Sequence, residues 1–283
     1  MLVTLREVLA DAQKGGYAVG AFNVNNMEIV QAIIEAAEEQ QSPVILQASQ
    51  GGLKYAGVDY IAAMARLAGE KANVPVVVHL DHGTDFEQIM LCVRNGFTSV
   101  MIDGSKYPLE ENVEVTKKVI EVAHAVGMSV EGELGKIGGV EDDVKVDERE
   151  AAMTDPADAE YFAKETGVDA LAISIGTAHG LYKGEPKLDF DRLKDIRAVV
   201  DTPLVLHGAS GVSDAAIKKA VELGICKINI DTDIRQAFTR GVHSAVEENP
   251  QEFDPRKILG PARDEMKNIV ATKMKLFGSA GKA

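Results

Sequence analysis

The sequence predicts a parallel (β/α)8 barrel, or TIM barrel, with an N-terminal capping helix and a C-terminal helical extension. Apolar, β-branched runs alternate with helical patterns eight times along the chain. The length of 283 residues suits this fold, which typically takes about 250 residues. Because the sequence shows no composition break, proline-rich linker or low-complexity tract, residues 1–283 are expected to form a single domain.

The expected elements follow one another in a regular order. Residues 4–14 carry apolar side chains at helical spacing and stop at Gly15 and Gly16, so this helix is expected to close the bottom of the barrel. The expected strands are residues 17–24, 44–49, 76–80, 99–102, 128–133, 170–175, 203–206 and 226–230. The expected helices include residues 28–40, 58–71, 85–95, 109–126 and 156–166, and a terminal helical run covers residues 261–277.

Composition limits the partners that the protein can bind. The net charge of −14 disfavours a general affinity for nucleic acid or for an anionic membrane surface. No stretch approaches the roughly 18 uninterrupted apolar residues of a membrane span, and residues 1–13 carry charges throughout, unlike a signal peptide. Cys92 and Cys226 show no disulfide or metal-ligand spacing. We therefore expect a soluble, cytoplasmic protein with no nucleic-acid or membrane partner.

Polar side chains stand where all eight predicted strands end. The β-branched run at residues 76–78 leads into His79, Asp81 and His82, and strand alternation places His79 and Asp81 on one face. Ligands of parallel α/β folds bind beyond the carboxyl ends of the strands, so these ends are expected to form a site. A simpler interpretation, in which Asp81 or Thr84 caps the following helix, leaves the two histidines unexplained. The strand-end residues are Asn23, Ser49, Asp81, His82, Asp103, Glu133, His179, His207, Asn229 and Asp231.

Three of the six histidines fall at strand ends, which favours a metal site. His82, His179 and His207 suit Zn²⁺, because catalytic zinc takes three protein ligands and keeps one position open. Asp103 and Glu133 either orient these imidazoles or hold a second metal, and the sequence leaves both options open.

Two loops after the last strands are candidates for binding phosphate. Residues 207–211, His-Gly-Ala-Ser-Gly, and residues 229–233, Asn-Ile-Asp-Thr-Asp, follow the seventh and eighth strands, where this barrel frequently binds phosphate. The glycines alone indicate little, because a turn with Ser213 as a helix cap explains them equally well. Their position beside a metal-ligand candidate favours the phosphate interpretation.

Residues 136–150 are too polar and too long for an ordinary loop of this barrel. Two interpretations stay open, a mobile lid over the site or a solvated acidic loop.

Five segments of the chain form a set with a distinctive order. They are residues 79–83, His-Leu-Asp-His-Gly; Gly132-Glu133-Leu134-Gly135 with Gly138-Gly139 and Glu141-Asp142; residues 176–183, Gly-Thr-Ala-His-Gly-Leu-Tyr-Lys; and the two loops at residues 207–211 and 229–233. Together they resemble the class II, zinc-dependent fructose-1,6-bisphosphate aldolases. The likeness runs from Asn23 to the tripeptide Asp254-Pro255-Arg256, nearly the whole chain. It implies the reversible aldol cleavage of fructose 1,6-bisphosphate to dihydroxyacetone phosphate and glyceraldehyde 3-phosphate, a reaction of glycolysis and gluconeogenesis.

The resemblance also implies roles for individual residues. Asp81 would exchange the proton on the C4 oxygen, and Glu141, on the mobile loop, would exchange the proton at C3. The catalytic Zn²⁺ would be held by His82, His179 and His207, with Asp103 and Glu133 near the position that the metal takes when it is drawn inward.

The implied substrate contacts divide between the two phosphates. Asn229 would touch the reacting carbons, and a monovalent cation would bind near the segment that contains Lys183. The dihydroxyacetone phosphate end would be surrounded by Gly180, Gly208, Ser210, Asp231 and Thr232. The other phosphate would meet Asn23, Ser49 and Arg256, with Arg256 supplied by the neighbouring subunit of a homodimer or homotetramer.

Four alternatives remain open at this point. The related tagatose-bisphosphate aldolases share most of these motifs. A Schiff-base aldolase would need a buried lysine, and Lys227 is the one lysine inside an expected strand, where pairing with a carboxylate is the more ordinary role. A metal-dependent hydrolase on the same barrel would activate water but lacks a use for the phosphate loops. A non-catalytic sugar-phosphate-binding barrel would not require Asp81 and Glu141 as well as three metal ligands.

Overall fold

The parallel barrel forms as the alternating pattern predicts. The structure is a computed structural model that describes residues 1–141, 144–146, 152–182 and 184–283. Its parallel strands form a closed barrel. The ring runs β1 (Val19–Asn23), β11 (Ile225–Ile230), β10 (Leu204–Leu206), β8 (Ala170–Ile173), β5 (Ser129–Leu134), β4 (Ser99–Ile102), β3 (Val76–Gly83) and β2 (Val44–Ser49). Consecutive barrel strands are therefore neighbours, as right-handed βαβ crossovers require.

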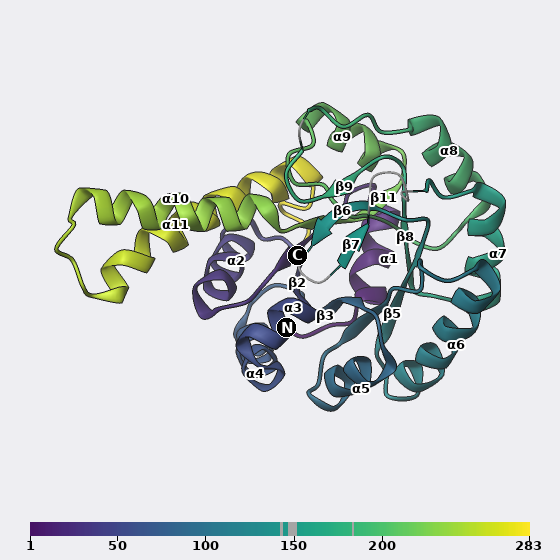
Figure 1. Ribbon diagram of the computed structural model, residues 1–283, viewed down its shortest axis with the longest axis horizontal. Coiled ribbons are helices and arrows are strands. Elements are labelled where there is room, and N and C mark those ends of the chain that lie inside the picture. Colours follow the sequence, from purple (N-terminus) through teal and green to yellow (C-terminus); the bar gives the residue numbers. More distant parts are fainter. Residues whose placement is uncertain (142–143, 147–151, 183) are drawn as a thin grey trace.

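The helices surround this ring (Figure 1). Side-chain oxygens begin several of them, since Asn26, Asp85 and Asp155 each accept a hydrogen bond from a backbone N–H of the first turn. No helix in the described part of the chain is long and apolar enough to cross a membrane. The helices are α1 (Leu5–Gly15), α2 (Met27–Gln40), α3 (Gln50–Ala56), α4 (Val58–Lys71), α5 (Phe86–Arg94), α6 (Leu109–Ala125), α7 (Pro156–Thr166), α8 (Phe190–Val199), α9 (Asp214–Glu222), α10 (Thr232–Glu248) and α11 (Pro255–Phe277).

Helix α1 closes the N-terminal end of the barrel, as expected. A capping box between Thr4 and Glu7 begins the helix, and Gly16 in the left-handed conformation ends it. Its buried face joins the lower barrel interior in one apolar cluster, which includes Leu5, Leu9, Ala21, Ile45, Val77 and Val205. Water is thus excluded from this end, and a site can open only at the other.

The inner face of the strands changes from apolar to polar along the barrel axis. In β2 the inward residues run Ile45, Gln47, Ser49, and in β3 they run Val77, His79, Asp81. The parallel register sets Gln47 beside His79 and Ser49 beside Asp81. Neighbouring strands therefore become polar at the same level, so their functional groups share one layer near the carboxyl ends.

Three segments differ from the expected elements. Residues 50–56 form the short helix α3, because Ser49 accepts a hydrogen bond from Gly52 and starts a helix directly after β2. The terminal helix begins at Pro255 and not at residue 261, since Asp254 caps it and Pro255 fills the first helical position, where a missing N–H costs nothing. Pro261 lies inside this helix.

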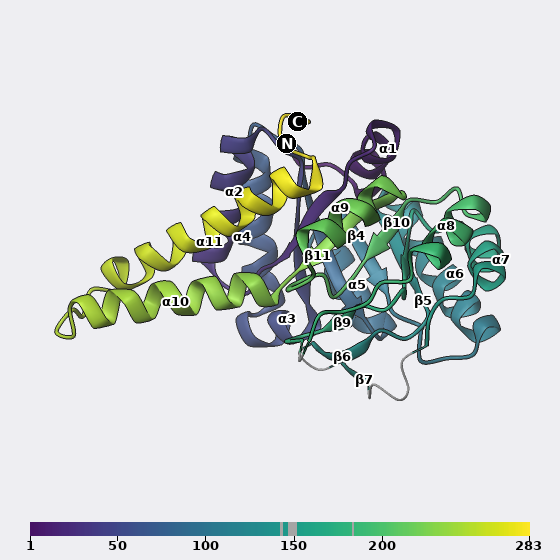
Figure 2. The same cartoon turned by 90° about the horizontal axis from the view of Figure 1, so that it is seen from above.

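The third difference concerns the long polar loop. Its described part forms a hairpin of β6 (Gly138–Glu141) and β7 (Val144–Val146), and β6 also pairs with β9 (Ala178–His179). Residues 142, 143 and 147–151 lie outside the described residues, so the choice between a lid and a solvated loop stays open. Figure 2 shows this small sheet at the end of the barrel opposite to α1 and the chain termini.

Helices α10 and α11 form an arm that projects from the barrel (Figures 1 and 2). They cross closely at Gly241, where an added Cβ would lie 2.4 Å from the Cα of Ala262 and 2.9 Å from the carbonyl oxygen of Pro261. Backbone atoms cannot move aside as a flexible side chain can. The absence of a side chain at this position therefore permits the crossing.

We expect Gly241→Ala to lower the free energy of unfolding by about 1–3 kcal/mol, the usual cost of overpacking. Gly260→Ala in α11 is the matched control, because no atom lies within 4 Å of its added Cβ and alanine favours the helix. Chemical denaturation monitored by circular dichroism compares the two. An equal gain of stability in both variants would contradict the proposed crossing constraint.

Candidate active site

The end of β3 carries two consecutive polar side chains, Asp81 and His82. Asp81 points into the barrel and is fully buried. His82 follows with φ of 48°, a left-handed conformation that costs a non-glycine residue of order 1–3 kcal/mol and is concentrated at functional sites. This backbone twist brings the imidazole of His82 back over the barrel mouth, where it meets two other histidines.

His82, His179 and His207 form a compact triad at the mouth. Their ring centroids are 4.8 to 6.0 Å apart, and one ligand atom from each lies within 4.8 Å of the others. Nε2 of His82 is 3.0 Å from Nδ1 of His207. The three histidines come from β3, from β9 and from the residue after β10, so the closed barrel assembles a set that is dispersed in the sequence.

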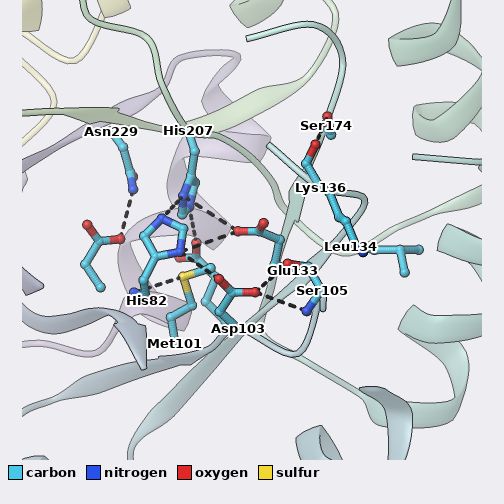
Figure 3. Close-up of polar contacts among 12 residues, drawn as sticks. His82, Met101, Asp103, Ser105, Glu133, Leu134, Lys136, Ser174, His207 and Asn229 are labelled. Atoms are coloured by element: carbon cyan, nitrogen blue, oxygen red, sulfur yellow. Dashed lines mark hydrogen bonds and ion pairs between the residues drawn. The ribbon is translucent and has the colours of Figure 1, made fainter. Parts of the chain in front are cut away.

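Carboxylates fix the orientation of two of these rings, and Figure 3 shows the contact of His82 with Asp103. Nδ1 of His82 bonds to Asp103 at 3.1 Å, and Nε2 of His207 bonds to Glu131 at 2.8 Å. In each ring the nitrogen turned away from the carboxylate is the one that faces the partner histidine. Such outer contacts are typical of metal-binding histidines, because they select the tautomer whose free nitrogen points to the metal.

The electrostatic environment also suits a cation. Burial lowers the pKa of His179 to about 3, so its imidazole is neutral and able to donate an electron pair. Burial, with the neighbouring Asp103, raises the pKa of Glu133 well above its usual value. Oε2 of Glu133 is buried without a hydrogen-bond partner and lies 3.8 Å from His82 and 3.9 Å from His207.

The donor atoms of the histidines and of Glu133 fit a metal ion on chemical grounds. A positive ion would satisfy the unpaired carboxylate oxygen and would accept the electron pairs that the imidazoles direct toward one another. Two overlapping donor sets are present, the histidine triad and the group His82, Asp103 and Glu133. The expected convergence of the three histidines with the two carboxylates is therefore seen.

Asp81 is held by amide groups from three strands. Oδ2 accepts hydrogen bonds from Asn23 at 2.9 Å and from Gln47 at 3.0 Å, and Oδ1 accepts one from Asn229 at 3.2 Å. Burial opposes its charge, but the nearby His82, His207 and Lys227 and the hydrogen bond from Asn23 lower the pKa of Asp81 below its usual value. The carboxylate is thus an ionised group in a fixed position, beside the histidine triad.

The helix-capping interpretation of Asp81 is not supported. Asp85, four residues later, caps α5 by accepting a hydrogen bond from the backbone of Gln88 at 2.8 Å. Likewise, Ser213 stands at the N-cap of α9 but its side chain makes no capping hydrogen bond.

The β6–β7 hairpin brings Glu141 into the neighbourhood of the triad. Gly139 pairs with His179, and an added Cβ on Gly139 would lie 2.2 Å from the carbonyl oxygen of His179. Gly139 has φ of 105°, so both its conformation and this close approach need glycine. Glu141 follows two residues later at the end of β6. Its side chain lies outside the described residues.

The expected phosphate loops line one cavity of about 550 Å³. Tyr182 braces it, accepting from the N–H of Ala178 at 2.7 Å and donating to the carbonyl of Gly208 at 2.8 Å. Asp231 lies at the start of α10, where its carboxylate pairs with Arg235 at 2.8 Å. The cavity lining includes Gly180, Ser210 and Thr232 of the expected set, with Gly211 and Ser213 beside them.

Of the residues expected at the second phosphate, Asn23 and Ser49 end the neighbouring strands β1 and β2, and Arg256 lies apart from them on α11. Asn23 turns inward to Asp81, and Ser49 caps α3. Arg256 lies on the arm, with its guanidinium 2.7 Å from Asp254 and 88% of its side chain exposed. Among the residues that the structure describes, the ion pair of Arg256 is with this neighbour and not with a strand-end residue. Lys183, near the expected cation, lies outside the described residues.

Sequence reasoning missed two buried residues of this site. Glu131 bonds to His207, and Gln47 bonds to Asp81. Each stands two positions before a residue that was recognised, Glu133 and Ser49, and residues two apart in a strand share a face. That spacing was the available signal. Lys227 was expected to pair with a carboxylate, and Glu131 is its partner at 2.9 Å.

The chain is similar over its full length to known proteins of one family. Residues 3–282 match the family model described as fructose-bisphosphate aldolase class-II. A fructose-bisphosphate aldolase of Thermus caldophilus is 51% identical, with both chains covered completely. One from Geobacillus stearothermophilus is 49% identical, with all of this chain and 99% of the relative covered. The crystal structure of the YdjI aldolase from Escherichia coli superposes with a TM-score of 0.86 at 39% identity, and each chain is covered completely.

Proposed function

The chain belongs to the class II fructose-bisphosphate aldolases, and from this membership we propose how its own residues carry out the cleavage of fructose 1,6-bisphosphate. The enzyme is a lyase that divides the sugar bisphosphate between C3 and C4. The observation that supports the proposal best is the position of an ionised, amide-held Asp81 next to three convergent histidines.

We propose that His82, His179 and His207 hold a catalytic Zn²⁺. When bound, the ion would supply Lewis-acid polarisation of the substrate ketone and stabilise the negative charge that develops as the carbon–carbon bond breaks. Asp103 and Glu131 would keep the ligand nitrogens of His82 and His207 turned toward it. Glu133, with its unpaired oxygen, would offer an inner position for the same ion together with Asp103.

Asp81 is proposed to accept the proton of the C4 hydroxyl. A carboxylate that three amides hold in a fixed position is placed to take a proton as the bond to C3 breaks. Asn229, which bonds to Asp81, would lie alongside the reacting carbons. In the direction of synthesis Asp81 would return the proton to the new hydroxyl oxygen.

The substrate is proposed to lie across the mouth between two phosphate sites. Gly180, Gly208, Ser210, Asp231 and Thr232 would surround the phosphate of dihydroxyacetone phosphate. In support, Gly180, Ser210 and Thr232 line the cavity at that side. Asn23, Ser49 and the partner-supplied Arg256 would meet the other phosphate. We further propose a homodimer or homotetramer, a monovalent cation near residue 183 and a cytoplasmic location.

Parallel rate measurements with fructose and tagatose 1,6-bisphosphate, together with metal analysis of the purified enzyme, test this proposal. We expect zinc to copurify and kcat/KM to favour the fructose epimer. A preference for the tagatose epimer would change the substrate, whereas tight binding of both without cleavage would favour a binding protein.

Glu141→Ala should slow the exchange of the C3 proton of dihydroxyacetone phosphate with solvent by about 10²–10⁴-fold, the usual contribution of a positioned acid or base. The pairing of Gly139 with His179 fixes the start of the segment that carries this carboxylate. Exchange is followed by NMR in deuterated buffer. Asp142→Ala is the control, and normal exchange in Glu141→Ala with slow exchange in Asp142→Ala would transfer the role to Asp142.

Arg256→Ala should raise KM for fructose 1,6-bisphosphate and leave proton exchange on dihydroxyacetone phosphate unchanged, because that product lacks the second phosphate. An exposed guanidinium can bind a phosphate in a bidentate manner if a partner subunit presents it. Steady-state kinetics measure the effect. Lys257→Ala, which removes a neighbouring cation paired with Glu252, is expected to leave KM unchanged.

Hybrid enzymes test whether the arginine crosses between subunits. Mixing Arg256→Ala with Asp81→Ala subunits should restore part of the activity, since one hybrid site then contains both native residues. No recovery in confirmed hybrids would place Arg256 within its own chain.

A further inference from the structure

A charged pair lies inside the barrel, below the histidine triad. Nζ of Lys227 is 2.9 Å from Oε2 of Glu131, and both side chains are fully buried. His79 faces the same carboxylate, with Nε2 3.5 Å from Oε2, and its Nδ1 contacts the hydroxyl of Ser99 at 2.8 Å. A buried pair is costly to desolvate and seldom a net source of stability compared with apolar packing. Its presence under a reactive centre therefore needs another explanation.

One end of the pair contacts a proposed metal ligand. Oε1 of Glu131 is 2.8 Å from Nε2 of His207, and an ionised carboxylate can only accept, so this nitrogen carries the proton. Nδ1 of the same ring is then unprotonated and faces His82 at 3.0 Å. Glu131 thus selects the tautomer in which His207 can donate its electron pair at the mouth.

The other end of the pair contacts the amide that holds the proposed base. Nζ of Lys227 donates to Oδ1 of Asn229 at 2.8 Å. An ammonium group has no acceptor, so the amide oxygen must face it and the amide nitrogen must face away. That nitrogen donates to Oδ1 of Asp81 at 3.2 Å. Lys227 therefore sets which end of Asn229 meets the carboxylate.

We infer that Glu131 and Lys227 are positioning residues that act as one unit. Glu131 fixes the tautomer of the proposed metal ligand His207. Lys227 fixes the orientation of the Asn229 amide, which in turn holds Asp81. The inference rests on the proposed roles of His207 and Asp81. Both residues of the pair would act through other side chains, Glu131 through His207 and Lys227 through Asn229. The pair couples two functional groups that lie on separate strands, β10 with its following residue and β3.

Glu131→Gln distinguishes this role from simple charge balance. Lys227 has only donors, so the new amide should turn its oxygen toward Lys227 and its NH2 group toward His207. Nε2 of His207 would then have to accept, and the ring proton would move to Nδ1, the proposed ligand atom. Removing Lys227 as well, in Lys227→Met/Glu131→Gln, frees the amide oxygen to return to His207 and leaves no unpaired charge.

Zinc affinity, measured by competition with a chromophoric chelator, should therefore fall about 10–100-fold in Glu131→Gln and recover toward the wild-type value in the double variant. In the metal-free proteins, long-range ¹H–¹⁵N spectra of labelled histidine should show the His207 proton on Nδ1 in the single variant only. Wild-type affinity in Glu131→Gln, or an affinity that stays equally weak in the double variant, would refute the tautomer argument.

The double variant also tests the second half of the inference. At saturating zinc its kcat should stay lower by about 10–100-fold with little change in KM, because Asn229 has lost its donor. Ser42→Ala is the control for lost stability, since the buried hydroxyl of Ser42 bonds to Ser279 at the end of the barrel that lies opposite to the site. It should lower the melting temperature without changing zinc affinity or kcat. Wild-type kcat in the double variant would refute the role of Lys227.

His207→Ala separates failure of this inference from failure of the proposed function. If zinc affinity is unchanged in His207→Ala, the metal assignment itself is wrong. If His207→Ala loses zinc while Glu131→Gln keeps it, the metal assignment holds and the positioning role of Glu131 is refuted.

Discussion

Chelation is expected to abolish the cleavage of fructose 1,6-bisphosphate, and added Zn²⁺ is expected to restore it. The reason is that breaking a carbon–carbon bond beside a ketone leaves negative charge, and the described barrel interior offers convergent imidazoles to hold a cation there. His207→Ala should have the same effect as the chelator, because a catalytic zinc site with three protein ligands tolerates the loss of one poorly. A coupled assay for glyceraldehyde 3-phosphate, with metal content determined on the same samples, measures both.

His243→Ala is the matched control, since this histidine is exposed on α10 and should keep full zinc content and activity. The competing mechanism is an imine on Lys227. The ammonium group of Lys227 is fully buried against Glu131, which leaves little opportunity for attack on a ketone. Full activity in chelator, with substrate trapped on Lys227 by borohydride, would nevertheless establish that mechanism.

The position of the site could be predicted because a parallel barrel gathers the carboxyl ends of its strands. Once eight alternations were recognised, His82 after the third strand and His207 after the seventh had to approach each other despite their separation in sequence. Topology brings both residues to the same end of the barrel, and the left-handed backbone at His82 helps to bring the two rings within 3.0 Å of each other. The same reasoning predicted that Asp103 and Glu133 lie close to these histidines, and both are found beside His82.

Most of the elements and residues that the sequence did not predict depend on contacts between segments that are far apart in the chain. The pairing of β6 with β9 joins residues some forty positions apart, and the glycines of β6 give no strand signal of their own. Glu131 lies within the expected strand at residues 128–133, but its partners His207 and Lys227 come from segments farther along the chain. Helix α3 was missed because Gly51 and Gly52 disfavour a helix and the capping hydroxyl of Ser49 compensates for only part of that preference.

Arg256 marks the limit of what one chain can explain. Its local contacts, an ion pair with Asp254 at the start of α11, are those of an ordinary surface arginine. The arm that carries it projects from the barrel (Figure 2). A role at the substrate phosphate would need a second copy of the chain, so neither the sequence nor the single fold contains the required contact.

Asp81→Ala should lower kcat by about 10²–10⁴-fold and leave the zinc content and the fold intact. The variant removes the proton acceptor, while His82 keeps its contact to Asp103 and His207 keeps its contact to Glu131. Asn23, Gln47 and Asn229 lose their common acceptor, and water can enter the space that the carboxylate leaves. Single-turnover kinetics with matched metal analysis and melting curves separate the chemical step from binding and from stability.

Asp85→Ala is the control, since Asp85 lies only four residues after Asp81. Asp85 is the residue that caps α5, so its loss should cost about 1 kcal/mol of stability and leave kcat unchanged. Loss of Asp81 should therefore lower kcat without lowering stability, and loss of Asp85 should lower stability without lowering kcat. If Asp81→Ala empties the zinc site, then Asp81 supports the metal and is not the base. If instead Asp81→Ala keeps both zinc and wild-type kcat, the proton of the C4 hydroxyl must go to another group, and the three amides that hold this carboxylate would have only a structural role.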